Sequence, residues 1–90
     1  MRQHDEYVNK LYKKLYGKFD VLKKYVKYEF GEMDIYAQLD DYIYYYEVKC
    51  TRSQRKKGLE QLKKFRKRFK YEKKHGLLYI GEDDLLEQIF

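Results

Sequence analysis

The sequence of 90 residues contains one cysteine and no proline, and its apolar residues are scattered in short groups. A single cysteine excludes an intramolecular disulfide. No stretch approaches the ~20 apolar residues of a membrane-spanning helix, and the first residues lack the pattern of a signal peptide. We therefore expect an intracellular, cytoplasmic protein that makes no contact with a membrane.

Linkers, repeats and low-complexity tracts are also missing, and the composition is typical of a folded chain. It is 43% hydrophobic, 40% charged and 19% aromatic, which is too apolar for a disordered segment and sufficient for a core. A domain of this length buries only somewhat more than ~60% of the surface that its unfolded chain exposes. We expect a single domain over residues 1–90, further stabilised by forming a homodimer.

Acidic and basic residues are segregated along the chain. Residues 29–47 contain six acids and no base, whereas residues 49–74 contain thirteen Lys and Arg against two acids, a net charge of +11. A basic surface beside an acidic pocket is typical of a protein that holds a polyanion while a metal assists attack on its backbone. The alternative is a solvated lysine-rich helix.

Residues 31–50 alternate aromatic or β-branched residues with polar ones on either side of Asp40-Asp41. This pattern predicts two strands joined by a two-residue turn. Asp34 would then face Glu47, with their β-carbons ~5 Å apart, and two carboxylates at that distance repel each other unless a proton or a cation lies between them. A divalent metal is the natural occupant. The other facing pairs would be Leu39 with Tyr42, Ala37 with Tyr44, and Ile35 with Tyr46.

Alternation assigns the side chains of this hairpin to two faces. Asp34, Glu47 and Lys49 would share a charged face. The core face would carry Met33, Ile35, Ala37, Leu39, Tyr42, Tyr44, Tyr46 and Val48.

The same residues carry a resemblance. Gly31-x-x-Asp34 followed by Glu47-Val48-Lys49 resembles the signature of the PD-(D/E)xK nuclease superfamily, although the proline that usually precedes the motif aspartate is absent. Gln61-x-x-x-Phe65 is similar to the Gln-x-x-x-Tyr motif of RecB-type members. The chain also resembles archaeal Holliday-junction resolvases, without their Ser-rich loop. The resemblance covers nearly the whole chain.

The resemblance implies an α/β fold with a restriction-endonuclease-like core: a helix, an antiparallel three-strand meander, a crossover helix and a strand, around a mixed central sheet. It implies a DNA nuclease dependent on Mg²⁺ or Mn²⁺, specifically a structure-specific endonuclease of the Holliday-junction-resolvase type. Alternatives are an inactive DNA-binding module on the same scaffold and an RNA-processing nuclease. The metal would be held by Asp34, Glu47, the carbonyl of Val48 and Asp5 or Glu6. Lys49 would orient or deprotonate the attacking water.

Residues 3–16 have the apolar spacing of an amphipathic helix that ends at Gly17. Asp5 would lie beside the apolar stripe and Glu6 nearly opposite it, so Asp5 is the favoured ligand. Either acid is equally well explained by the dipole of the helix N-terminus. We expect His4 at the surface.

The rest of the chain predicts a strand at 21–30, a helix capped by Thr51 or Ser53 that runs to about residue 76, a strand at 77–80 and a last helical turn after Asp83-Asp84. Gln61 lies one helical turn before Phe65, from where it could reach the catalytic carboxylates or simply pack. The basic residues predicted to hold DNA backbone are Arg52, Arg55, Lys56, Lys57, Lys63, Lys64, Arg66 and Lys67. The tail residues Leu85, Leu86, Ile89 and Phe90 would form a dimer surface or pack back on the core.

Overall fold

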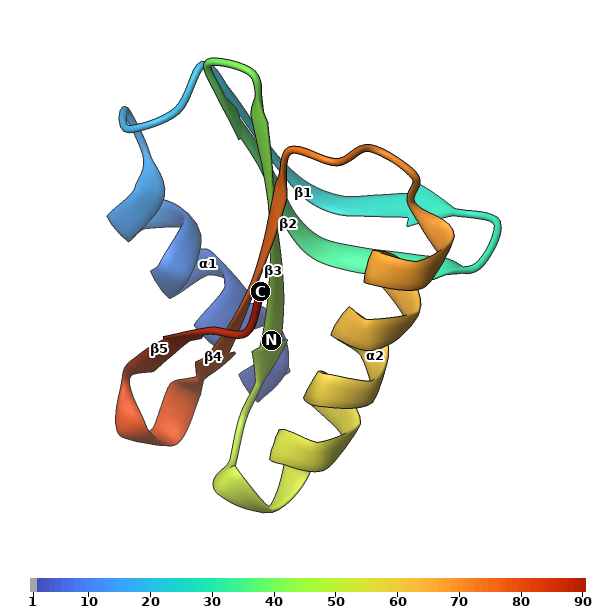
Figure 1. Cartoon of the computed structure of the whole chain (residues 1–90). Helices are drawn as coiled ribbons and strands as arrows, with labels where there is room; N and C mark the ends of the chain where they lie inside the picture. Colours follow the sequence, from blue (N-terminus) through green and yellow to red (C-terminus); the bar gives the residue numbers. More distant parts are fainter. Residues whose placement is uncertain (1) are drawn as a thin grey trace.

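The computed structural model describes residues 2–90 and has an α/β architecture, with a five-stranded mixed sheet and two helices (Figure 1). Short 3₁₀ turns lie at Arg52–Gln54 and Gly81–Asp83. The helices and strands in chain order are α1 (Gln3–Leu15), β1 (Val21–Tyr28), β2 (Gly31–Leu39), β3 (Tyr42–Lys49), α2 (Arg55–Arg68), β4 (Lys74–Ile80) and β5 (Leu85–Gln88).

The strand order in the sheet is the same as the order in the chain. Strands β1, β2 and β3 form an antiparallel meander, α2 crosses over, and β4 pairs parallel to β3. These features confirm the predicted order of helix, meander, crossover helix and parallel strand. An additional strand, β5, pairs antiparallel with β4. Within residues 2–90, no helix is long and apolar enough to cross a membrane.

Helix α1 covers one face of the sheet (Figure 1). Its buried residues Val8, Leu11 and Leu15 pack on Ile35 and Val48 of the sheet. The helix ends at Leu15, and Gly17 follows with a φ of 83°, a left-handed conformation that glycine adopts without steric cost. The predicted amphipathic helix is therefore confirmed.

Helix α2 covers the opposite face (Figure 1), where Leu62 and Phe65 pack on Met33, Tyr45 and Leu78. The sheet thus has a hydrophobic core on each side. The prediction that one face of the hairpin is core and the other only charged is wrong, because α2 supplies a second apolar layer that covers most of the second face.

The predicted hairpin register is confirmed for Leu39 with Tyr42, Ala37 with Tyr44 and Ile35 with Tyr46. The predicted face of Met33 is wrong, because Met33 packs under α2 whereas Ile35 packs under α1. The β1–β2 pairing is interrupted at Tyr25 and Asp34, and Tyr25 has a φ of 55°. This irregularity breaks the simple alternation of side chains along β2.

Two predicted helical segments differ from the structure. Helix α2 ends at Arg68, because Phe69 is extended and Lys74 already pairs with Ile43 as β4 begins. The side chains of Thr51 and Ser53 bond each other and cap neither the 3₁₀ turn nor α2.

The predicted last helical turn is instead the strand β5, which Asp84 enters from a left-handed conformation with a φ of 49°. The tail is divided between the two roles considered for it. Leu85 and Leu86 are exposed, and Ile89 and Phe90 pack back against the core under α2.

Candidate active site

The candidate site lies where β2 separates from β3. Their ladder ends at Ile35 and Tyr46, and beyond this point β1 and β2 curve away from β3 and toward α2 (Figure 1). The freed Val48 N–H donates to Asp34 Oδ2 at 2.8 Å, so the carboxylate replaces a backbone acceptor of the ladder. The separation of the strands therefore fixes Asp34 beside the end of β3, close to Glu47.

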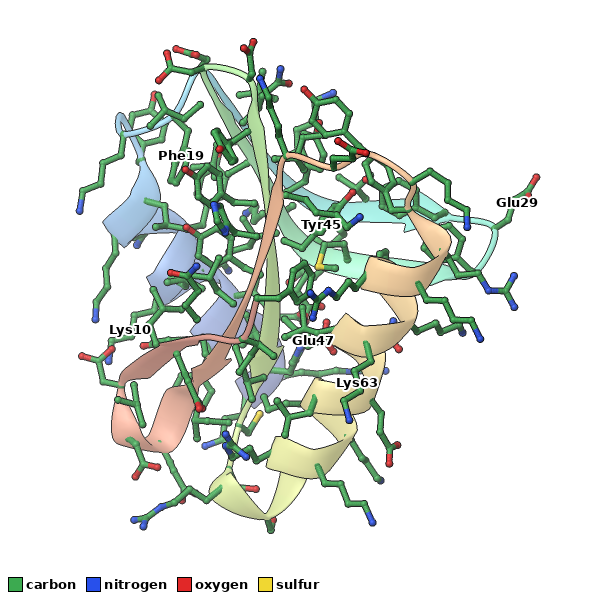
Figure 2. All side chains as sticks on the ribbon, viewed as in Figure 1. Lys10, Phe19, Glu29, Tyr45, Glu47 and Lys63 are labelled. Atoms are coloured by element: carbon green, nitrogen blue, oxygen red, sulfur yellow. The ribbon has the colours of Figure 1, made fainter. Side chains whose placement is uncertain are left out.

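Glu47 follows Tyr45 on the α2 side of β3 (Figure 2). It is 5% exposed, and Asp34 is 7% exposed. One carboxylate oxygen of Glu47, Oε2, lies 3.3 Å from Lys49 Nζ. The other, Oε1, is buried without a hydrogen-bond partner among residues 2–90. An unpaired buried carboxylate oxygen is costly, and this points to a ligand that is bound there in function.

Burial raises the pKa of Glu47 to about 8, and the negative charge of Asp34 raises it further in the same direction. Lys49 opposes this shift through its positive charge and its hydrogen bond. Glu47 therefore carries a proton at neutral pH in the metal-free protein. A divalent cation would take the place of that proton, because it stabilises the ionised form of both carboxylates.

Lys49 is held against the first part of α2. A Cβ added at Gly58 would lie 2.5 Å from Leu78 Cδ1 and 3.3 Å from Lys49 Cγ. Only glycine lets the helix approach the sheet this closely, and the approach fixes the aliphatic part of Lys49. The ammonium group stays partly accessible, with 24% of the side chain exposed.

His4 is a member of the site that the sequence analysis missed. Its Nε2 lies 3.3 Å from Asp34 Oδ2 and 3.1 Å from the carbonyl oxygen of Val48. The expectation that His4 is only a surface residue is wrong. The signal was present in the sequence, since residues 4, 8, 11 and 15 form one stripe of α1 and the last three are buried.

Asp5 and Glu6 were the candidates for an additional ligand from the first helix. The Tyr25 hydroxyl donates to Asp5 Oδ1 at 2.7 Å, and Asp5 lies 4.0 Å from His4 Nδ1. Burial, with the hydrogen bond to Asp5, raises the pKa of Tyr25 to about 12, so this phenol remains a donor. Glu6 is exposed. The structure therefore places Asp5 next to the site through His4 and leaves Glu6 outside it.

The residues present fit a metal that needs few protein ligands. No cluster of three or more His, Cys, Asp or Glu side chains with ligand geometry occurs between residues 2 and 90. Asp34, Glu47 and the Val48 carbonyl supply oxygen ligands only. Mg²⁺ commonly binds through one or two carboxylates and keeps several waters, and Mn²⁺ accepts the same ligands. The orphaned Glu47 Oε1 agrees with such a site.

Gln61 lies against the start of β2. A Cβ added at Gly31 would be 2.9 Å from Gln61 Nε2, and Gly31 has a φ of 149°, so both space and backbone favour glycine. Phe65 packs one turn further along α2, with its ring centroid 5.0 Å from that of Phe30. Gln61 is thus brought near the strand that carries Asp34, and no hydrogen bond joins it to either carboxylate in the described chain.

The eight basic residues predicted to hold DNA separate into two groups. Arg52 and Arg55 are already paired, with Asp83 at 2.9 Å and with Glu87 at 2.7 Å. The remaining six lie exposed along α2, where Lys63 projects away from the sheet (Figure 2). No carboxylate of the described chain is within ion-pair distance of these six, which are Lys56, Lys57, Lys63, Lys64, Arg66 and Lys67.

Comparison with known proteins adds no relative to this description. No protein-family model, no curated protein and no solved structure matches the chain. The fold and the geometry of the site are therefore the basis for the functional argument.

Proposed function

We propose that the protein is a metal-dependent nuclease that hydrolyses DNA phosphodiester bonds, with Asp34, Glu47 and Lys49 at its active site. One observation carries the proposal: two buried carboxylates lie together, one of them with an unpaired oxygen, beside a partly exposed lysine. Such an arrangement costs stability, and proteins retain such costs mainly at functional sites.

Asp34, Glu47 and the Val48 carbonyl would hold Mg²⁺ or Mn²⁺, which supplies charge stabilisation at the scissile phosphate and a more acidic bound water. Lys49 Nζ, 3.3 Å from Glu47 Oε2, would orient the attacking water and take part in its deprotonation. His4 directs the Asp34 carboxylate and the Val48 carbonyl toward one point, because its Nε2 contacts both. The metal ligands are thereby positioned before the substrate binds.

The unpaired basic residues of α2 support DNA as the substrate. Their side chains are free to neutralise backbone phosphates, which supplies affinity without sequence specificity. We propose a structure-specific endonuclease of the Holliday-junction-resolvase type, acting in DNA recombination and repair as a homodimer. The exposed Leu85 and Leu86 on the edge strand β5 are the proposed dimer contact.

The test is cleavage of labelled four-way junction, linear duplex, single-stranded DNA and RNA of the same sequence, each with magnesium and with chelator. The proposal predicts cleavage of DNA in magnesium and none in chelator, with the junction cut faster than the linear duplex. Binding without cleavage in any metal would instead support an inactive DNA-binding module. Cleavage of RNA alone would support an RNA-processing nuclease.

A further inference from the structure

A second concave site lies on the α2 side of the sheet. It is a pocket of about 380 Å³, within the ~300–1,000 Å³ that is typical of small-molecule sites. Three aromatic residues line it, Tyr28, Tyr36 and Phe69, and two polar ones, Lys23 and Gln38. The pocket therefore combines several aromatic rings with one positive charge and one amide.

The curvature of β1 and β2 creates this pocket. The two strands bend toward the end of α2 (Figure 1), and Phe69 follows the last residue of that helix. The rings support one another: Phe69 lies 6.1 Å from Tyr28 and 5.3 Å from Tyr45, and Tyr45 lies 6.2 Å from Tyr36, between ring centroids. Rings packed in this way are preformed for binding and lose little conformational entropy when a ligand stacks on them.

The pocket is a neighbour of the candidate active site. Tyr36 follows Asp34 by two residues in β2, which is ~7 Å along a strand. Tyr45, against which Tyr36 packs, precedes Glu47 by two residues in β3. A nucleic-acid strand with one phosphate at the carboxylates would therefore have an adjacent nucleotide within reach of the pocket.

We propose that this pocket binds an unpaired nucleobase of the DNA strand that is cut, so that the substrate class is DNA with a single-stranded segment and not uninterrupted duplex. The inference rests on the proposed function, since it assumes that DNA occupies the adjacent site. Aromatic side chains stack on bases of any sequence, and only an unpaired base can enter a pocket to do so. Lys23 would contact the phosphate, and the Gln38 amide can donate to and accept from a base edge.

The chain has no tryptophan, so Phe69→Trp would place a single tryptophan in the pocket wall. Tryptophan emission and DNA anisotropy are measured in chelator with oligothymidylate, with an abasic strand of the same length and with a blunt duplex. We expect oligothymidylate to quench the emission on binding. The abasic strand should bind through its phosphates without quenching, and the duplex should not quench.

Val21→Phe in the same background fills the pocket from its rim and removes no ring. It should abolish quenching and weaken oligothymidylate binding by roughly 5- to 100-fold, as expected for the loss of one stacked base, with abasic binding unchanged. Tyr16→Ala, which removes an exposed ring at the end of α1, is the matched control and should change neither signal.

Equal emission with oligothymidylate and with the abasic strand, when both are bound by anisotropy, would overturn the inference. This comparison uses Phe69→Trp alone, so it does not depend on the folding of Val21→Phe. The nuclease proposal fails separately. Quenching without cleavage in magnesium would retain the pocket and reject the nuclease, and cleavage of blunt duplex without quenching would do the reverse.

Discussion

Two carboxylates of this protein, Glu47 and Asp84, each contact a lysine, yet their environments have opposite effects on them. Asp84, in the turn between β4 and β5, bonds Lys14 and Tyr79 and lies 3.7 Å from Lys10. The bond from Lys14, then that from Tyr79, lowers the pKa of Asp84 to about 2. Glu47 is buried beside a second acid, and its pKa is raised to about 8.

The difference shows what a lysine contact alone does not reveal. Asp84 keeps its solvent contact and gains several donors, so its ionised form is favoured in the folded state. Glu47 loses its solvent contact, shares its surroundings with Asp34 and keeps one oxygen unpaired. Asp84 has the properties of a structural ion pair and Glu47 those of a ligand site, and each prediction below compares the two kinds of group.

The largest expected effect is on catalysis. Asp34→Ala, Glu47→Ala and Lys49→Ala should each lower the cleavage rate at least ~100-fold, because each removes a metal ligand or the group that orients the water. DNA affinity should survive, since the binding charge lies on α2. Asp84→Asn is the matched control and should cut at the wild-type rate. Wild-type cleavage by any of the three alanine variants would remove that residue from the site.

The second effect is on stability in chelator. The pKa of Glu47 is raised in the folded state, so the stability associated with its protonated form is complete below ~4.3 and is lost as the pH rises through about 8. Glu47→Gln removes this loss. At pH 8 the variant should have a free energy of unfolding higher than wild type by on the order of 1 kcal/mol, and below pH ~4 the difference should vanish.

Asp84→Asn should do the opposite. The folded-state pKa of Asp84 is lowered, so its ion pairs stabilise the protein at neutral pH and their contribution is lost as the pH falls through about 2. Urea unfolding across this pH range compares the two variants. A Glu47→Gln protein less stable than wild type at pH 8 would mean that Glu47 forms a structural ion pair with Lys49.

The third effect is on the salt dependence of DNA binding. Lys56→Ala with Lys57→Ala should reduce the slope of log affinity against log salt by at most about two, alike for all sequences. Arg55→Ala should reduce it less, because its guanidinium already pairs with Glu87. Binding titrations at several salt concentrations measure the slopes. A larger change for Arg55 than for the lysine pair would mean that Arg55 exchanges Glu87 for a phosphate.

The smallest effect concerns association. Leu85 is 54% exposed and Leu86 41% exposed on β5, an edge strand whose outer side could pair with that of a second copy. Leu85→Lys should shift the protein from dimer to monomer in sedimentation at tens of micromolar, roughly the range for a modest interface. Lys73→Ala, distant in the sheet order, should not. A monomeric wild-type protein at this concentration would contradict the proposed dimer.

Local patterns were enough to predict much of the fold. The spacing of Leu11 and Leu15 gave α1, and the Asp40-Asp41 turn gave a register that the structure confirms. The parallel pairing of β4 with β3 followed from a crossover helix. The meeting of Asp34 with Glu47 followed from the same register, although a side-chain bond to Val48 N–H replaces the expected backbone pairing.

The errors arose where long-range packing decides the outcome. Tyr25 and Asp34 interrupt the β1–β2 pairing, and no local pattern predicted that Met33 would change sides. Leu85 and Leu86 have the composition of a helical turn, but the free edge of β4 makes them a strand. His4 was overlooked because its contacts are 30 and 44 residues away, although its place on the apolar stripe of α1 indicated that it faces the sheet.

The most direct test of the central claim is calorimetric titration of the DNA-free protein with Mn²⁺ at pH 7, in buffers that differ in their ionisation enthalpy. Because Glu47 is protonated below about pH 8, a metal that binds it must release a proton. The account predicts binding with release of close to one proton for wild type and for Asp84→Asn, and no binding for Glu47→Gln. Mn²⁺ binding to Glu47→Gln with wild-type affinity and proton release would contradict the assignment of Glu47 as a metal ligand.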